Sequence, residues 1–245
     1  MGFRAAVRFL TILPVHGGDA PPGQAAAFFP LVGAMLGAAG AGVYLLAAKA
    51  FPISIAALAT VAFWIAISGI LHEDGLADVA DAVRAGRTRE RVLSILKDSR
   101  IGTFGAVAIL LSVLARWQAL EYLATPRVLE TMIAAQAVPR AAIVAMAWCS
   151  RPAGSGLGLG LGYALASTLS TPAAMAAIAQ GAAAALLCGW RPGLAMIAGS
   201  VLIVQASRGW FYVRLGGVNG DCLGFTEQLI EIFVLTMFAC RACAW

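Results

Sequence analysis

The sequence predicts an all-α integral membrane protein, a polytopic bundle of about seven transmembrane helices that forms a single domain over residues 1–245. Two observations carry this prediction. Of the 245 residues, 61% are hydrophobic and only 12% are charged, whereas soluble domains are about half apolar and about a quarter charged. The apolar residues also fall into stretches that approach the roughly 20 residues that a spanning helix needs.

Seven such stretches follow one another along the chain. They cover residues 25–49, 54–71, 104–123, 128–149, 172–189, 194–213 and 225–244. Several are rich in Ala and Gly, which favours close helix–helix packing in lipid. The fourth is the most polar, because it contains Glu130, Gln136, Pro139 and Arg140. At the N-terminus, the short apolar run 9–15 is broken by Pro14, and we expect a retained interfacial segment.

The polar segments between these stretches predict the orientation in the membrane. An even number of spans separates the N-terminus, the loop 72–103, the Gly-rich run 154–160 and the turn 214–224, so all four belong on one side. Ten basic residues fall on that side and four on the other. The positive-inside rule therefore assigns the polar segments to the cytoplasm. The basic residues form no stripe interleaved with aromatics, so we expect no nucleic-acid partner.

The main chemical signal is the segment HEDGLADVADA, residues 72–82. Asp74, Asp78 and Asp81 are spaced i, i+4 and i+7, so a helix would present all three carboxylates on one face. Like charges on adjacent turns repel one another, and a divalent cation would remove that repulsion. Carboxylate oxygens favour Mg²⁺, which keeps waters and binds substrate phosphates. The alternative is a solvated acidic face, balanced by the arginines that follow.

Two further polar segments are predicted to lie near these aspartates. In KDSRIGTFG, residues 97–105, the cations could neutralise phosphate and the glycines permit close backbone approach to a ligand. The residues that we single out there are Lys97, Asp98, Ser99, Arg100 and Gly102. The turn GGVNGDCLG, residues 216–224, adds Asn219 and Asp221. Asn-Gly and Gly-Asp are also ordinary turn sequences, so this segment alone requires no function.

Charged residues within the predicted spans must pair, line a polar cavity or reach the interface. They are Arg116, Arg140, Arg208, Glu121, Glu130, Glu227 and Glu231. His72 has no neighbour at zinc-ligand spacing, so we expect a substrate contact or a hydrogen-bonded residue. Cys240 and Cys243 have CxxC spacing, but no second pair or histidine lies nearby in the sequence. They are interpreted as small apolar residues at a helix end.

Taken together and in order, RFLTILPV (8–15), FPLVGAMLG (29–37), HEDGLADVADA, KDSRIGTFG and GGVNGDCLG resemble the cobalamin synthase family, the adenosylcobinamide-GDP ribazoletransferases. The resemblance covers most of the chain. It implies a multi-pass enzyme of the bacterial cytoplasmic membrane that depends on Mg²⁺ and faces the cytoplasm. Its substrates would be adenosylcobinamide-GDP and α-ribazole or its 5′-phosphate, with membrane lipid around it and a homo-oligomer as one compatible assembly.

The implied reaction is the attack of a ribazole hydroxyl on the phosphate attached to cobinamide, with release of GMP. Asp74, Asp78 and Asp81, together with Asp221, are expected to hold one or two Mg²⁺ ions against the pyrophosphate. Lys97 and Arg100 would stabilise the charge on GMP. Asp98 or Glu73 would accept the proton, and His72, Ser99, Gly102 and Asn219 would contact substrate.

Three other classes share some of these features. CDP-alcohol phosphotransferases also use aspartates with Mg²⁺, but in DGLADVADAVRAG the arginine, Arg84, comes too late for their motif. Membrane prenyltransferases carry aspartate motifs twice, and the second half here offers only Asp221. A transporter would place charges in matched halves, whereas the acids concentrate in one segment and no internal repeat is seen.

Overall fold

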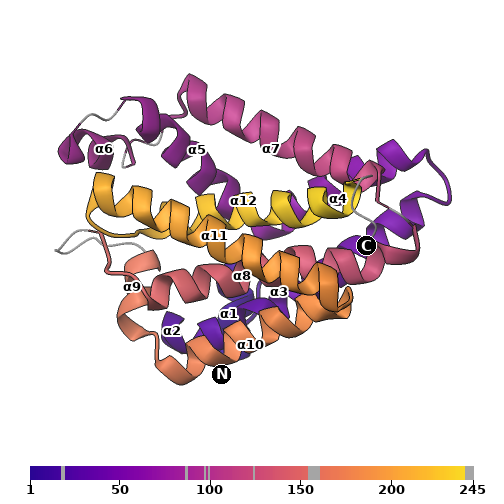
Figure 1. Cartoon of the computed structure of the whole chain (residues 1–245), viewed down its shortest axis with the longest axis horizontal. Helices are drawn as coiled ribbons and strands as arrows, with labels where there is room; N and C mark the ends of the chain where they lie inside the picture. Colours follow the sequence, from indigo (N-terminus) through magenta and orange to yellow (C-terminus); the bar gives the residue numbers. More distant parts are fainter. Residues whose placement is uncertain are drawn as a thin grey trace.

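The computed structural model describes residues 1–17, 20–85, 88–96, 98, 100–123, 125–153 and 161–240. Lys97, Ser99, Cys243 and the Gly-rich run 154–160 lie outside this part of the chain. The described residues form helices throughout, and the one β-bridge among them joins Pro152 to Val218. The all-α prediction is therefore confirmed (Figure 1).

The first half of the chain builds one side of the bundle. It contains α1 (Gly2–Leu10), α2 (Pro22–Ala25), the short 3-10 turn η1 (Ala26–Phe28), α3 (Phe29–Ala47), α4 (Ile53–Ser68), α5 (Leu71–Ala85), α6 (Arg89–Ile95) and α7 (Thr103–Glu121). Helix α1 is a short helix with Ala6, Val7 and Leu10 on its buried side and Arg4 and Arg8 exposed. This arrangement fits the interfacial segment expected there.

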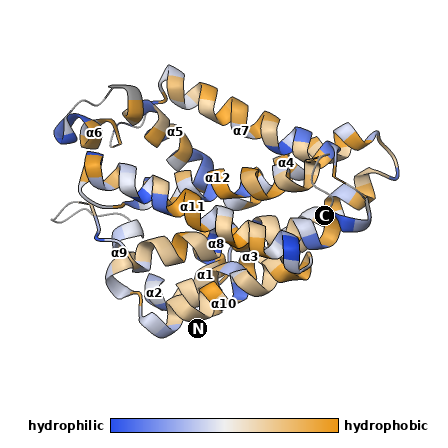
Figure 2. Ribbon diagram, in the orientation of Figure 1, coloured by the Kyte–Doolittle hydropathy of each residue, from blue (hydrophilic) through white to orange (hydrophobic). Residues whose placement is uncertain are grey.

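The second half contains η2 (Thr125–Arg127), α8 (Val128–Trp148), α9 (Leu161–Thr168), α10 (Thr171–Leu187), α11 (Trp190–Leu215) and α12 (Gly220–Ala239). Within the described chain, five helices or helix runs are long and apolar enough to cross a membrane, and up to seven cross if each of two bent pairs is one span. These seven correspond to the seven predicted stretches. Figure 2 shows apolar residues along α7 and polar residues at α6.

Helix α8 lies at the centre, and most of its residues are buried. Helix α3 packs against it closely because Gly33 and Gly37 face the backbone of α8, where any side chain would collide with the carbonyl groups of Gln136 and Met132. Glycines four residues apart are the usual device for such an approach in membranes. The segment FPLVGAMLG thus serves helix packing.

The segment predicted as a loop at 72–103 is largely helical, which corrects that part of the prediction. Helix α4 ends at Gly69, and both Gly69 and Ile70 adopt the left-handed conformation, with φ of 64° and 65°. This turn bends the chain by 89° into α5. Apolar Leu76, Val79 and Ala82 are buried, so the motif pairs an acidic face with an apolar face and forms a helix.

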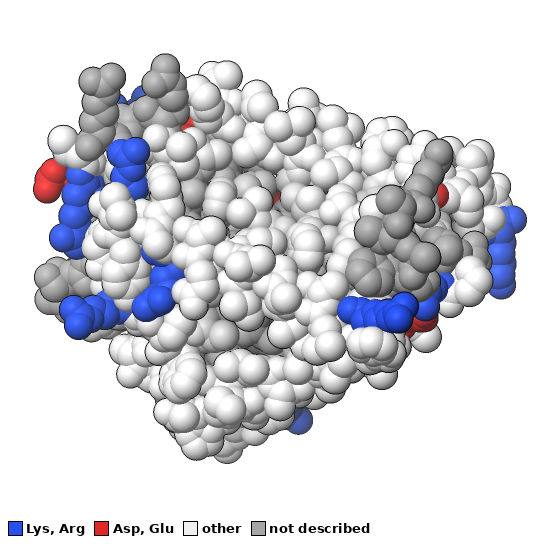
Figure 3. Space-filling model, viewed as in Figure 1, with Lys and Arg blue, Asp and Glu red and all other residues white. Residues whose placement is uncertain are grey.

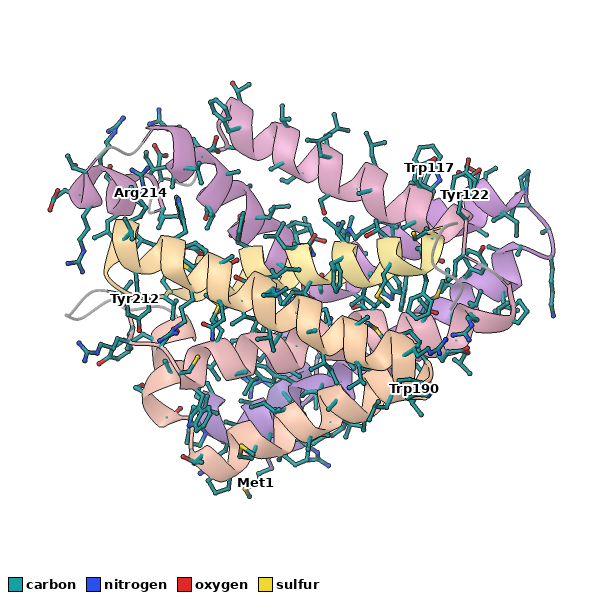
Figure 4. All side chains as sticks on the ribbon, in the orientation of Figure 1. Met1, Trp117, Tyr122, Trp190, Tyr212 and Arg214 are labelled. Carbon is teal, nitrogen blue, oxygen red and sulfur yellow. The ribbon has the colours of Figure 1, made fainter. Side chains whose placement is uncertain are left out.

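Two of the polar segments predicted on one side of the membrane, 72–103 and 214–224, lie at the same end of the bundle (Figure 1). Val218 exchanges backbone hydrogen bonds with Arg151 and Ala153, at 2.9 and 2.8 Å, which ties the turn before α12 to the end of α8. Helix α6 packs near the end of α11. In Figure 4, Tyr212 and Arg214 lie at this end, and Trp117, Tyr122 and Trp190 lie at the other.

Candidate active site

Four aspartates from two helices come together at this end of the bundle. Asp74, Asp78 and Asp81 lie along α5, and Asp221 lies in the first turn of α12. Asp78 interacts electrostatically with the other three. Asp74 is exposed and the other three are partly buried. The sequence predicted that Asp74, Asp78 and Asp81 share one helical face and that Asp221 joins them, and the structure has this arrangement.

Glycines allow α12 to approach α5 so closely. A Cβ atom at Gly75 would lie 2.8 Å from the backbone oxygen of Asp221, and one at Gly224 would lie 3.3 Å from the backbone oxygen of His72. Real Cβ atoms rarely come within 3.4 Å of another heavy atom. The two glycines therefore set the separation between the aspartates of α5 and Asp221.

Asp81 differs from the other aspartates because both its oxygens accept backbone hydrogen bonds. Gly102 N–H donates to Oδ2 at 2.7 Å, and Gly105 N–H donates to Oδ1 at 2.9 Å. These amides belong to the N-terminus of α7, where the helix dipole stabilises a carboxylate. A Cβ atom at either glycine would collide with Asp81. The two glycines of KDSRIGTFG thus seat Asp81 and join α5 to α7.

Asn219 orients Asp221, as the amides of Gly102 and Gly105 orient Asp81. Its Oδ1 accepts from the backbone N–H of Cys222 at 3.0 Å, which caps α12, and its Nδ2 donates to Asp221 Oδ2 at 2.7 Å. The asparagine therefore begins the helix and orients the carboxylate at the same time. In the described structure, Gly102 and Asn219 contact the aspartates themselves.

Asp98 and Arg100 lie apart from the aspartate cluster and form an exposed pair. The Arg100 Nη2 and Nε atoms donate to Asp98 at 2.7 and 3.0 Å. Hydrogen bonds from Arg100 lower the pKa of Asp98 to about 2. A general base works best with a pKa near the operating pH, so Asp98 is poorly suited to the role of base that the sequence suggested.

His72 and Glu73, which precede Asp74 in α5, are both buried. Glu73 Oε1 lies 3.0 Å from Arg116 Nη1 of α7, and the same nitrogen lies 3.4 Å from Glu231 Oε1 of α12. His72 Nε2 lies 3.9 Å from Glu227 Oε1. Neither residue faces the aspartates, so Glu73, the other base suggested by the sequence, points into the bundle.

A second ion pair continues this buried network. Arg140 Nη1 of α8 lies 2.9 Å from Glu227 Oε1, without the alignment of a hydrogen bond, and donates to the backbone oxygen of Gln136 at 2.7 Å. Gln228 accepts from Ser112 at 2.8 Å and donates to Glu227 at 3.2 Å. The prediction that some charges within the spans pair with one another is confirmed for Arg116, Arg140, Glu227 and Glu231.

The aspartate cluster has the oxygen-donor chemistry that a Mg²⁺ ion requires. Among the described side chains, no cation pairs with Asp74 or Asp78, so none of them balances the repulsion within the cluster. The described side chains include no complete set of three metal-ligating groups. Mg²⁺ commonly takes one or two carboxylates and completes its shell with waters and substrate phosphates, so the residues fit this ion.

A cavity elsewhere in the bundle is less suited to this chemistry. It has a volume of about 210 Å³, lies between α8, α10 and α11, and is lined mainly by small and aliphatic side chains. No carboxylate lines it. This cavity therefore offers no ligands for a divalent cation.

Sequence reasoning missed the parts of the site that position the carboxylates. Gly75, Gly105 and Gly224 stand inside the three motifs, but their partners are distant in sequence and are revealed only by the packing of α5, α7 and α12. The available signal was the coincidence of glycine with aspartate in all three segments.

Comparison with known proteins identifies the family of the chain. The family model described as cobalamin-5-phosphate synthase matches residues 2–239. Among curated relatives, the adenosylcobinamide-GDP ribazoletransferase of Ralstonia nicotianae is 38% identical over 94% of this chain and 91% of its own. Those of Vibrio cholerae and Bradyrhizobium diazoefficiens are 38% and 37% identical, covering 86% and 96% of this chain and 81% and 92% of their own. No solved structure matches. The chain belongs to the cobalamin-5-phosphate synthase family.

Proposed function

We propose that the protein transfers the adenosylcobinamide-phosphate group from adenosylcobinamide-GDP to α-ribazole or its 5′-phosphate and releases GMP. A ribazole hydroxyl oxygen bonds to the phosphorus attached to cobinamide, the bond from that phosphorus to GMP breaks, and the hydroxyl proton leaves. The observation that carries the proposal is the meeting of Asp74, Asp78 and Asp221, from two separate motifs, without a described cation to balance them. The names of the relatives support the choice of substrates.

Attack on a pyrophosphate requires that the phosphate charge be neutralised and the reacting groups be aligned. Asp74 and Asp78, with Asp221, would hold Mg²⁺, and Asp81 would fix the end of α5 through the amides of α7. When bound, the ion would act as a Lewis acid on the pyrophosphate and as a template for the two substrates.

Cations of the segment KDSRIGTFG would stabilise the negative charge of the GMP leaving group. Arg100 is 86% exposed in its side chain, although it pairs with Asp98, and its guanidinium can exchange that partner for a phosphate. Lys97 is proposed to share this role from the same motif, and Ser99 to contact substrate. The leaving nucleotide would then lie between the aspartates and α6.

We further propose that this end of the bundle faces the cytoplasm. The described basic residues Arg89, Arg91, Arg100, Arg151 and Arg214 belong to segments at this end, and Figure 3 shows basic side chains gathered there. Fewer basic residues, Lys49, Arg127 and Arg191, belong to the opposite end. The positive-inside rule favours the cytoplasm for the richer side, where the nucleotide substrates occur.

The test is GMP release by the full chain, purified in detergent and returned to lipid, with both substrates and either Mg²⁺ or EDTA. We expect GMP only when both substrates and Mg²⁺ are present. GMP release that persists in EDTA would overturn the metal assignment. No GMP from folded protein would overturn the reaction, and CMP release from a CDP-alcohol would then identify the other class of transferase.

A further inference from the structure

Helix α5 presents two acidic surfaces with opposite surroundings. Asp74 is exposed and Asp78 is partly buried, whereas the neighbouring residue Glu73 is 2% exposed and lies among α7 and α12. Adjacent residues of a helix point about 100° apart, which separates the two surfaces. Any movement of Glu73 must therefore move Asp74, which follows it directly in the chain.

The turn before α5 does not fix the direction of this helix by itself. The bend of 89° is made at Gly69 and Ile70, and Ile70 is a β-branched residue with a φ of 65°. This conformation is unfavourable for such a side chain and persists only where surrounding contacts impose it. Contacts made by α5 itself must therefore hold the helix in place.

One such contact at the start of α5 is the ion pair of Glu73 with Arg116. The guanidinium is 1% exposed and Nη1 lies 3.0 Å from Glu73 Oε1. A charged pair inside a bundle resists separation, because each charge left alone would be buried without a partner. The pair thus fixes the first turn of α5 against α7, while Asp81 fixes the last turns against the start of the same helix.

We infer that Glu73 is a positioning residue for the divalent-cation site: through Arg116 it holds α5 so that Asp74 and Asp78 can bind the ion together with Asp221. The inference rests on the proposed function, in which these aspartates hold Mg²⁺. It replaces the role of general base with a structural link between the buried network and the site.

The same arginine provides a matched control. Glu231 is also 2% exposed and lies 3.4 Å from Arg116 Nη1. Glu73→Gln and Glu231→Gln each remove one acid from the same guanidinium and leave the other acid in place. Only Glu73 belongs to α5, since Glu231 lies in the second half of α12, a helix of 20 residues that packs against α5, α7 and α8. The two variants therefore differ in position and share the replacement of a carboxyl group by an amide.

The experiment measures cation binding directly in both variants and in the natural chain. Mn²⁺, which favours the same oxygen ligands as Mg²⁺, is titrated into protein in lipid with adenosylcobinamide-GDP present and no acceptor, and free Mn²⁺ is followed by its electron paramagnetic resonance. The Mg²⁺ concentration for half-maximal GMP release and the thermal unfolding temperature are measured on the same preparations.

We expect Glu73→Gln to weaken Mn²⁺ binding and raise the half-maximal Mg²⁺ concentration by about tenfold or more, as partners that orient metal ligands commonly do. Glu231→Gln should change both by clearly less than about tenfold, the lower end of the effect that the loss of such a partner has. Both variants should lower the unfolding temperature similarly. A purely stabilising role of Glu73 predicts equal cation binding in the two variants, and that result would overturn the inference.

Two further arms keep the test decisive. If Glu73→Gln is not recovered folded, Glu73→Asp and Glu231→Asp make the same comparison, because they keep the charge and withdraw each carboxylate by one methylene. The Mn²⁺ titration needs no turnover, so it tests the positioning role even where the natural chain releases no GMP. Absence of GMP from the natural chain would count against the proposed function alone, whereas unchanged Mn²⁺ binding in the Glu73 variants would count against the inference.

Discussion

The protein contains two clusters of charged residues, one at the end of the bundle and one within it, and they differ in how their charges are balanced. In the buried cluster, Arg116 and Arg140 lie within 3.4 Å of carboxylates. In the outer cluster, Asp74 and Asp78 repel each other and no described cation pairs with either. Balanced charges stabilise a packed arrangement, whereas unbalanced like charges are a cost that a bound ion can remove. This difference is the reason why we propose the outer cluster as the cation-binding site.

The largest effect should come from breaking the balance of the buried cluster. Arg140→Gln leaves Glu227, which is fully buried, without its cation. Loss of one partner of a buried pair costs roughly 3–5 kcal/mol, so we expect a large fall in the thermal unfolding temperature in detergent. Arg208→Gln is the control, since Arg208 lies in α11 and hydrogen-bonds Gln205 instead of a carboxylate. Equal stability of the two variants would contradict the contrast between the clusters.

The next largest effect is expected where Asp81 of the outer cluster contacts the start of α7. A side chain at Gly105 would collide with Asp81 Oδ2 and with the backbone of Ala77. Gly105→Ala should therefore shift α5 against α7 and reduce GMP release by about 10- to 100-fold, as losses of orienting contacts do. Gly209→Ala is the matched control, because nothing lies within 4 Å of that position. Similar activities in both variants would mean that the contact of Asp81 with α7 is not required for GMP release.

A smaller effect is expected at the cap of α12. Asn219→Ala removes the cap on Cys222 and the hydrogen bond to Asp221, so the unfolding free energy should fall by about 1 kcal/mol and GMP release by about tenfold. Ser170→Ala removes the comparable cap of α10, on Ala173, and should affect stability alone. If both variants kept full activity, Asp221 would not need Asn219 to orient it.

The smallest effect is expected at Asp98. Arg100 lowers the pKa of this carboxyl to about 2, so its charge is complete at neutral pH, and the stabilising pair is lost only as the pH falls from about 4 towards 2. Between pH 5 and 9, Asp98→Asn should therefore leave the shape of the rate profile unchanged and alter the rate by less than about threefold. Loss of one limb of the profile would instead mark Asp98 as the base.

Much of this arrangement was predictable from local patterns. Hydropathy predicts the spanning helices, counting spans places the polar segments on one side, and helical spacing puts Asp74, Asp78 and Asp81 on one face. These features depend on residues close in sequence. The bend at Ile70 was not predicted, because a β-branched residue is a poor candidate for a positive φ, and the motif was consequently predicted as a loop.

The partners of charged residues were beyond sequence reasoning for a different reason. Hydropathy indicates that Arg116 and Arg140 need carboxylates, but three buried glutamates can serve, and packing over more than 40 residues of chain decides which does. The same holds for the glycines that seat Asp81, because they face an aspartate on another helix. Local sequence patterns therefore predict which residue types form the site, whereas the tertiary packing decides which of them contact one another.

The most direct test of the account is GMP release and Mn²⁺ binding by Asp78→Asn, with Glu90→Gln as the control from the exposed side of α6. We predict that Asp78→Asn loses at least about 100-fold in rate, about 2.7 kcal/mol of transition-state stabilisation, and most of its Mn²⁺ binding, while it unfolds at the same temperature as the natural chain or higher. Wild-type rate and Mn²⁺ binding in folded Asp78→Asn would contradict the assignment of the aspartate cluster as the active site.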